Sequence, residues 1–134
     1  MIVQQGTQTN SQGRFPKSHR LLRHSDFERV YKQGRRHFAG HMTVFYRRRP
    51  DDELKDTRVG FTVSKALGGA VQRNRIRRRL REAVRLSDFS TVTAVDVVIN
   101  PKRSALTAEF GDLQSEIVKA FQVIGRSLAK GKQV

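Results

Sequence analysis

The spacing of apolar residues along the chain predicts a small fold that mixes helices and strands. Apolar residues three or four positions apart predict helices, and apolar residues that alternate with polar ones predict strands. The predicted helices cover residues 26–33, about 73–86, and a long segment that begins at residue 107. The predicted strands cover residues 41–48, 58–64 and 94–100. This order predicts the α+β class, an α/β sandwich in which helices pack on a small central sheet.

The first predicted helix has recognisable start and stop signals. Ser25 and Glu28 have the spacing of a capping box, and Asp26 suits the positive end of the helix dipole. Gly34 is placed to stop the helix directly after Gln33. These signals predict a short helix that stops before the basic segment that follows.

Aromatic residues lie on the inner face of this helix, where Phe27 and Tyr31 flank Val30. The ordinary role of an aromatic pair on a short helix is packing in a core. The alternative is stacking on unpaired bases, which stabilises single-strand binding by about 1–3 kcal/mol per base. The local pattern favours the core role and leaves stacking as the alternative.

The second predicted strand has two unlike faces. One face is apolar and the other carries only small, largely polar groups: Val59, Phe61 and Val63 alternate with Gly60, Thr62 and Ser64. A sheet face with such small side chains leaves room for a ligand.

The segment RNRIRRRLREAVR, residues 73–85, is the strongest functional signal in the chain. At a helical period its apolar residues form one stripe, made of Ile76, Leu80, Ala83 and Val84. Seven arginines, Asn74 and a single carboxylate, Glu82, occupy the remaining positions. Because guanidinium is planar, always charged and able to donate two hydrogen bonds to phosphate, this pattern predicts RNA or DNA as the partner. The alternative is an ordinary solvated helix face.

The composition agrees with a binder of polyanions. The 134 residues include 27 Lys and Arg against 12 Asp and Glu, which gives a formal net charge of +15. The chain has no cysteine, so it can form neither a disulfide nor a thiolate zinc site. No apolar run approaches the ~20 residues that span a bilayer, and we expect a cytoplasmic protein with no membrane contact.

We expect one compact domain at residues 18–129, between a disordered polar tail at residues 1–17 and a basic tail at residues 130–134. A second basic strip runs from before the first helix, through it, to the residues that follow it, and two strips suggest two RNA strands. The strip consists of Arg14, Lys17, Arg20, Arg23, Arg29, Lys32, Arg35 and Arg36.

Candidate catalytic groups are few. The only dense carboxylates are Asp51, Asp52, Glu53 and Asp56, and a run beside Pro50 is more typical of a solvated turn than of a Mg²⁺ site. The histidines, which are His19, His24, His37 and His41, have no spacing that marks an acid–base pair or a metal site. We predict no catalytic residue and no metal ligand.

Two segments of the chain resemble a known family. Residues 59–85, VGFTVSKALGGAVQRNRIRRRLREAVR, closely resemble the signature of the bacterial ribonuclease P protein subunit, including its Arg-Asn-Arg motif at Arg73, Asn74 and Arg75. The upstream segment HSDFERVYKQG, residues 24–34, matches as well. The resemblance covers residues 20–128, and two ordered motifs are far more specific than one basic helix.

The resemblance implies a protein that binds a large catalytic RNA and helps it remove the 5′ leader from precursor tRNA. It implies that the RNA subunit performs the hydrolysis with Mg²⁺, that the protein alone is not catalytic and binds no cofactor, and that no protein partner is required. It also implies that the basic helix is exposed in a left-handed β-α-β crossover, against the usual right-handed preference.

The resemblance further implies two sets of site residues. The RNA-binding set is Lys65, Arg73, Asn74, Arg75, Arg77, Arg78, Arg81 and Arg85. The leader-binding set, in a cleft between the first helix and the open sheet face, is Phe27, Tyr31, Phe45 and Thr62. This role favours stacking for the two aromatic residues of the first helix.

The chain departs from the family pattern at two positions. Ala66 stands where a second lysine is common, and Asn100 stands where an arginine is common; Lys102 and Arg103 are near enough to replace the latter. The alternative function is a general RNA-binding or ribosome-associated protein. An independent metal nuclease is a distant third, since it would require convergent acidic ligands.

Overall fold

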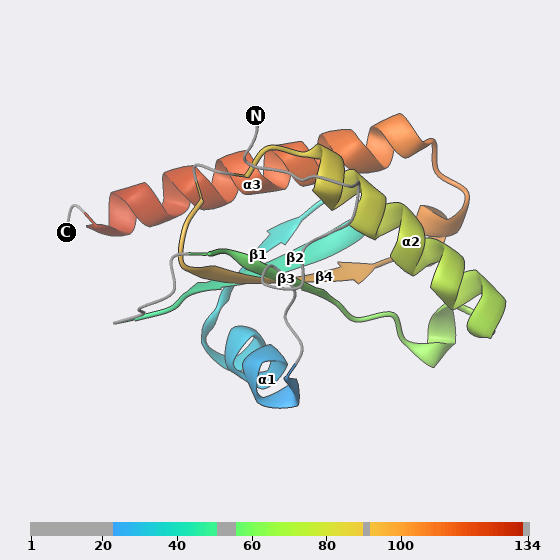
Figure 1. Ribbon diagram of the computed structural model, residues 1–134, viewed down its shortest axis with the longest axis horizontal. Coiled ribbons are helices and arrows are strands. Elements are labelled where there is room, and N and C mark those ends of the chain that lie inside the picture. The colour runs from blue at the N-terminus through green and yellow to red at the C-terminus, as the bar shows by residue number, and fades with distance from the viewer. Residues whose placement is uncertain (1–22, 51–55, 90–91, 133–134) are drawn as a thin grey trace.

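The computed structural model describes residues 23–50, 56–89 and 92–132 (Figure 1). The helices are α1 (His24–Gln33), α2 (Ala70–Leu86) and α3 (Phe110–Lys132). The strands are β1 (Arg35–Phe38), β2 (Met42–Arg48), β3 (Arg58–Phe61) and β4 (Val95–Pro101). Two short 3₁₀ helices, η2 (Lys65–Leu67) and η3 (Arg103–Leu106), precede α2 and α3.

The four strands form one sheet in the order β1-β2-β4-β3. β2 is antiparallel to both of its neighbours, whereas β3 and β4 are parallel and are joined through α2. Figure 1 shows α2 and α3 on one face of the sheet and α1 on the other. The predicted α+β sandwich with a β-α-β crossover is therefore confirmed, and the left-handed sense of the crossover stays a prediction.

The main core lies between the sheet and the helix pair α2 and α3. Alternate residues of a strand point to one face, so β2 and β4 each supply one apolar row to this core. The buried residues of these rows are Met42, Val44, Tyr46, Val95, Val97 and Ile99. The predicted stripe of α2 is buried against them, as is that of α3 through Leu113, Ile117, Phe121 and Ile124. This packing directs the remaining face of α2 outward.

A second, smaller core holds α1 against the opposite face of the sheet. Val30 of α1 and Val98 of β4 are fully buried there, and Phe27 and Phe45 pack beside them while staying partly exposed. The core role predicted for the aromatic residues of α1 is thus confirmed for Phe27. The contact leaves part of each ring open to solvent.

The start of α1 differs from the prediction, whereas its end at Gln33 agrees with it. The helix begins at His24 after Arg23, which makes no capping hydrogen bond, and Ser25 lies inside the first turn, so the predicted capping box was wrong. The first turn is instead fixed by ion pairs of the buried Asp26. Gly34 follows the last helical residue, Gln33, as predicted, and it has an ordinary φ of −86°. Glycine is needed because a Cβ would contact the carbonyl oxygen of Val30 and lie 2.6 Å from that of Tyr46.

Strand boundaries differ from the prediction by a few residues, and one strand was missed. β1 has no apolar alternation because its side chains are mostly exposed, and it forms by pairing with β2 through a tight turn. α2 begins three residues before the predicted start. α3 begins at Phe110, three residues later than predicted, because residues 107–109 form the connection between η3 and the helix.

Candidate nucleic-acid interface

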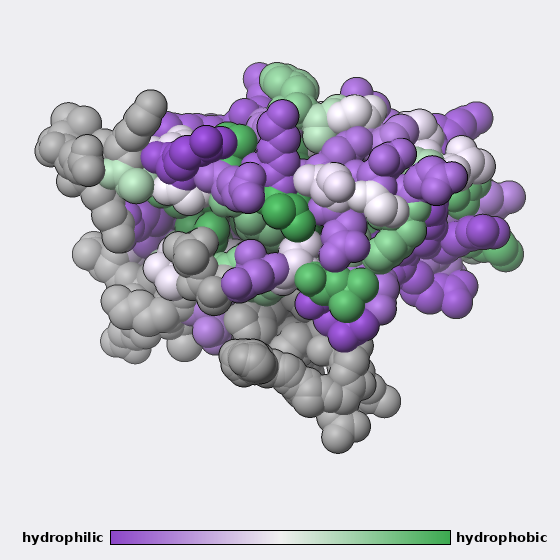
Figure 2. Space-filling view, turned by 90° about the horizontal axis from the view of Figure 1, so that it is seen from above, coloured by the Kyte–Doolittle hydropathy of each residue, from purple (hydrophilic) through white to green (hydrophobic). Residues whose placement is uncertain are grey.

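Helix α2 presents most of its arginines on the side that faces away from the core. The helix is anchored by its buried stripe, so these side chains project from a rigid element. Figure 2 looks onto the face that carries α2 and α3, where hydrophilic side chains dominate and hydrophobic ones form small separate areas. A cationic surface on a fixed helix suits the binding of a phosphate backbone.

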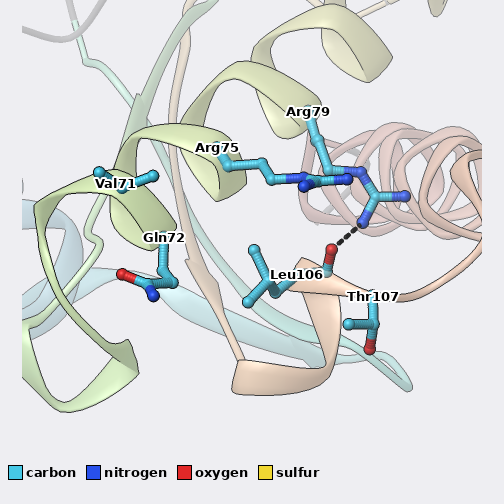
Figure 3. Close-up of a pocket in the computed structure, with 6 residues that line it drawn as sticks. All are labelled: Val71, Gln72, Arg75, Arg79, Leu106 and Thr107. Carbon is cyan, nitrogen blue, oxygen red and sulfur yellow. Dashed lines mark hydrogen bonds between the residues drawn. The ribbon is translucent and has the colours of Figure 1, made fainter.

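The arginines of α2 differ in what they contact. Arg79 donates to the carbonyl oxygens of Ala105 at 2.5 Å and Leu106 at 2.8 Å, and also to that of Ala108 (Figure 3). These contacts hold the segment around η3 against α2. Arg79 is therefore a structural residue, in accord with its absence from the predicted RNA-binding set.

Arg85 forms a bidentate pair with Glu82, with Nε–Oε1 at 2.8 Å and Nη2–Oε2 at 2.6 Å. Hydrogen bonding within this pair raises the pKa of Arg85 and lowers the pKa of the Glu82 carboxyl. Glu82 thus occupies one guanidinium of the predicted RNA-binding set and leaves the others without a carboxylate on the same helix.

Other members of the predicted RNA-binding set contact neighbouring polar groups. Arg73 donates to the carbonyl oxygen of Gly68 at 3.2 Å, and Arg77 donates to Oδ1 of Asn74 at 2.8 Å. Arg81 is partly buried. Each of these side chains is held close to the helix surface.

Three members of the set have no such contact. Lys65, Arg75 and Arg78 are exposed, and their side chains form no hydrogen bond or ion pair with any other residue that the structure describes. Lys65 lies in η2, the short helix that precedes α2, whereas Arg75 and Arg78 lie on α2 itself. These are the positive charges most available to an external phosphate.

A depression of about 440 Å³, which Arg75 helps to line, lies between α2 and η3. Figure 3 shows Arg75 and Arg79 extending from α2 toward η3, over the apolar side chain of Leu106. No carboxylate lines the depression; its lining residues are Val71, Gln72, Arg75, Arg79, Leu106 and Thr107. The depression therefore combines positive charge with apolar walls.

The other face of the sheet carries a group of side chains that we call the aromatic surface, which consists of Phe27, Tyr31, Phe45, Thr62 and Asn100. The rings of Tyr31 and Phe45 meet edge to face, with centroids 4.9 Å apart. The Tyr31 hydroxyl lies 2.6 Å from Oγ1 of Thr62 and donates to Oδ1 of Asn100 at 2.9 Å. All four predicted leader-binding residues thus converge, from α1, β2 and the end of the β3 segment.

The structure also gives a role to Asn100, which stands where an arginine is common in the family pattern. Its amide oxygen accepts the single proton of the Tyr31 hydroxyl, so Thr62 is the donor in the second hydrogen bond. An arginine has no acceptor atom and cannot form this contact. Asn100 consequently fixes the orientation of the Tyr31 ring, a role that the sequence did not indicate.

An ion network missed by the sequence reading fastens α1 to the sheet. Asp96 of β4 accepts hydrogen bonds from Arg49 at 2.5 Å and from Arg58 at 2.9 and 2.8 Å. Arg58 also lies 3.7 Å from Asp26 of α1, which pairs with Arg29 at 3.2 Å. The hydrogen bond to Asp96 raises the pKa of Arg58 despite its partial burial. These charges are neutralised internally, which sets them apart from the free cations of α2.

The second predicted basic strip is divided among several roles. Three of its residues, Arg14, Lys17 and Arg20, lie outside the described residues. Arg29 is in the ion network, and Arg35 donates to Oγ of Ser127 at 2.7 Å. Arg23 and Lys32 are exposed, whereas Arg36 lies over aromatic rings. The strip is therefore not one continuous surface within the described part of the chain.

Among the predicted histidines, His24 lies 3.8 Å from Glu28, and His41 contacts neighbouring polar groups. His41 Nδ1 lies 2.7 Å from Oγ of Ser104, and its backbone N–H donates to Glu116. Asp51, Asp52, Glu53 and His19 lie outside the described residues. Residues 23–50, 56–89 and 92–132 contain no group of three His, Cys, Asp or Glu residues that is able to hold a metal ion. None of the described helices is long and apolar enough to cross a membrane.

Comparison with known proteins relates this arrangement to one family. Residues 15–125 match the Ribonuclease P family. The ribonuclease P protein component of Finegoldia magna is 37% identical over 103 residues, which cover 76% of this chain and 87% of that protein. The ribonuclease P protein component of Acidothermus cellulolyticus is 39% identical over 101 residues, which cover 75% of this chain and 83% of that protein.

Solved structures show the same fold. The RNase P protein of Staphylococcus aureus superposes with a TM-score of 0.68 at 28% identity, covering 81% of this chain and 96% of that one. The RNase P protein of Thermotoga maritima superposes with a TM-score of 0.65 at 21% identity, and the match covers 76% of this chain and 94% of that one. Family match, relatives and fold agree, and the chain belongs to the ribonuclease P protein family, the protein subunit of ribonuclease P.

Proposed function

We propose that this subunit binds two RNAs at once, the catalytic RNA of ribonuclease P through α2 and the 5′ leader of precursor tRNA through the aromatic surface. The observation that carries the proposal is the convergence of Phe27, Tyr31, Phe45 and Thr62 on the sheet face opposite α2. Two separate surfaces of different chemistry suit two different RNA partners.

The surface on α2 has the chemistry of a phosphate-binding site. Lys65, Arg75 and Arg78 carry charges without a partner in the described structure, and we assign them to phosphate oxygens. The remaining members of the set, Arg73, Asn74, Arg77, Arg81 and Arg85, are assigned to the same RNA. Neutralising phosphates releases counterions, so this binding weakens steeply as salt rises.

The aromatic surface has the chemistry of a single-strand site. Aromatic rings stack on any base, which allows precursors with different leader sequences to bind. Because Tyr31 is held by Thr62 and Asn100, its ring loses little freedom on binding. The site therefore tolerates sequence variation while retaining affinity.

Catalysis belongs to the RNA subunit, which we propose performs the hydrolysis with Mg²⁺ in the cytoplasm. The contribution of the protein is to hold two polyanions together, which lowers their mutual repulsion and the Mg²⁺ concentration that the reaction requires. No side chain of the protein is assigned a role in bond cleavage.

The test is a reconstitution with and without the RNA subunit. We expect no cleavage by the protein alone, 5′ processing when RNA is added, and affinity that increases with leader length. Mature tRNA, which lacks a leader, is the matched control substrate. Cleavage by protein from which all RNA has been removed would contradict the proposal, as would equal affinity for precursor and mature tRNA, the result expected of a general RNA-binding protein.

A further inference from the structure

Beyond the aromatic surface, β1 places a cation and an aromatic ring on the same side of the sheet. Arg36 pairs in register with Phe45, and Phe38 pairs with Thr43. Met42 and Val44 point into the main core, so the alternating residues Thr43 and Phe45 face the side of α1. Their partners on β1 share that face.

The contacts of Arg36 join this pair of residues to the aromatic surface. Its guanidinium carbon lies 5.9 Å from the ring centroid of Phe38 and 5.9 Å from that of Phe45. Phe45 in turn contacts Tyr31. The four side chains form a continuous series of ring, ring, cation and ring that runs from α1 to the edge of the sheet.

The end of this series at the sheet edge, Arg36 and Phe38, is exposed to solvent and available to a ligand. Phe38 is 69% exposed, more than any other aromatic residue in the described part of the chain, and β1 is the end strand of the sheet. Within the same described residues, Arg36 has no carboxylate within ion-pair distance. An exposed ring beside an unneutralised guanidinium matches the two parts of a nucleotide, since a base stacks and a phosphate accepts hydrogen bonds.

We propose that Arg36 and Phe38 extend the single-strand site by at least one leader nucleotide beyond Tyr31 and Phe45, with Arg36 on a phosphate and Phe38 stacked on a base. This inference rests on the proposed binding of the leader at the aromatic surface. It adds a nucleotide position that the predicted leader-binding set did not include.

The test compares wild type and Phe38→Ala, each assembled with the catalytic RNA, on precursor tRNAs whose leaders lengthen one nucleotide at a time. For short leaders we expect equal Kd values. Beyond one leader length, we expect Phe38→Ala to bind about 5- to 150-fold more weakly, the factor that corresponds to about 1–3 kcal/mol per stacked base. Phe38→Trp, which keeps a ring, should restore binding.

Two further variants sharpen the test. Arg36→Gln should reduce the salt dependence of Kd only for the leaders on which Phe38→Ala has an effect. Val118→Ala, which also shortens an exposed apolar side chain but lies on α3, is the matched control and should follow the wild-type curve at every leader length.

The possible failures are distinguishable. If wild-type affinity does not increase with leader length, the proposed leader site itself is wrong. If it does increase and Phe38→Ala follows the same curve, or loses the same factor at every length, only the extension is wrong. Sedimentation at the assay concentration provides another check: a dimer that dissociates on Phe38→Ala would show that Phe38 contacts a second copy of the chain and would overturn the extension.

Discussion

The guanidinium of Arg79 donates to the carbonyl oxygen of Leu106 at 2.8 Å, so one arginine of the basic helix holds η3 in place. Its other contacts go to the carbonyl oxygens of Ala105 and Ala108. Arg78, the preceding residue, is exposed and has no such contact in the described structure. Adjacent arginines with the same chemistry therefore have separable roles, and stability and RNA binding should respond to different substitutions.

Arg79→Ala should lower the free energy of unfolding by at least about 1.5–3 kcal/mol, the contribution of one hydrogen bond to a charged group. The loss arises because three carbonyl oxygens lose their guanidinium donor. Urea denaturation measures the change. Arg78→Ala is the matched control on the same helix and should stay within about 0.5 kcal/mol of wild type. Equal destabilisation by both variants would contradict the structural role of Arg79.

Arg78→Gln should weaken binding of the catalytic RNA and reduce the slope of log K against log salt by about 1, because one phosphate contact is lost. A salt titration of the Kd measures the slope. Arg126→Gln removes the same charge from an exposed position on α3 and serves as the control. An identical reduction in both variants would mean that only net charge matters.

Tyr31→Phe should raise the Kd of leader-bearing precursor by about 2- to 12-fold, which corresponds to the net contribution of about 0.5–1.5 kcal/mol from a hydrogen bond. The ring is kept, but Thr62 and Asn100 no longer fix it. Competition binding against mature tRNA measures the effect, and the Kd of mature tRNA should not change. Asn100→Ala should give a similar loss, and the double variant should lose less than the two single losses added. Additive losses would contradict a shared network.

The Glu82–Arg85 pair should make stability depend on pH in the acidic range. The pKa of Glu82 is lowered from its ordinary value of about 4.5 by the hydrogen bond from Arg85. A lowered pKa in the folded state stabilises the fold above the ordinary value, and this stabilisation is lost as the pH falls through the lowered pKa. Urea denaturation should therefore show a wild-type advantage over Glu82→Gln near neutral pH that disappears in strong acid. An advantage that persists in acid would contradict the pair as its source.

The long helices could be predicted from the sequence because the burial of one apolar stripe determines each of them. In α2 and α3 the burial of a continuous apolar stripe determines both the helix and the face that packs, so residues such as Ile76 and Ile117 were placed in the core correctly. The predicted leader-binding residues came from the resemblance to the family. No local pattern places Thr62 beside Tyr31, since 31 positions separate them in the chain.

Features that depend on tertiary contacts could not be predicted. β1 is a strand because its backbone pairs with that of β2, and its own residues show no alternation of apolar and polar side chains. The start of α1 is set by Asp26 and its partner Arg58 from a distant strand. The local capping signal at Ser25 was overridden by these ion pairs, because a buried charge requires a partner more strongly than a helix end requires a cap.

The placement of α1 and α2 on opposite faces of one sheet has a mechanical consequence. If the two RNAs bind as proposed, the thickness of that sheet sets the distance between them, and strands β2 and β4, paired antiparallel over seven residues, give the sheet little freedom to bend. On that proposal, substitutions that enlarge or reduce the layer of side chains around Val98 should alter the position of the leader relative to the catalytic RNA.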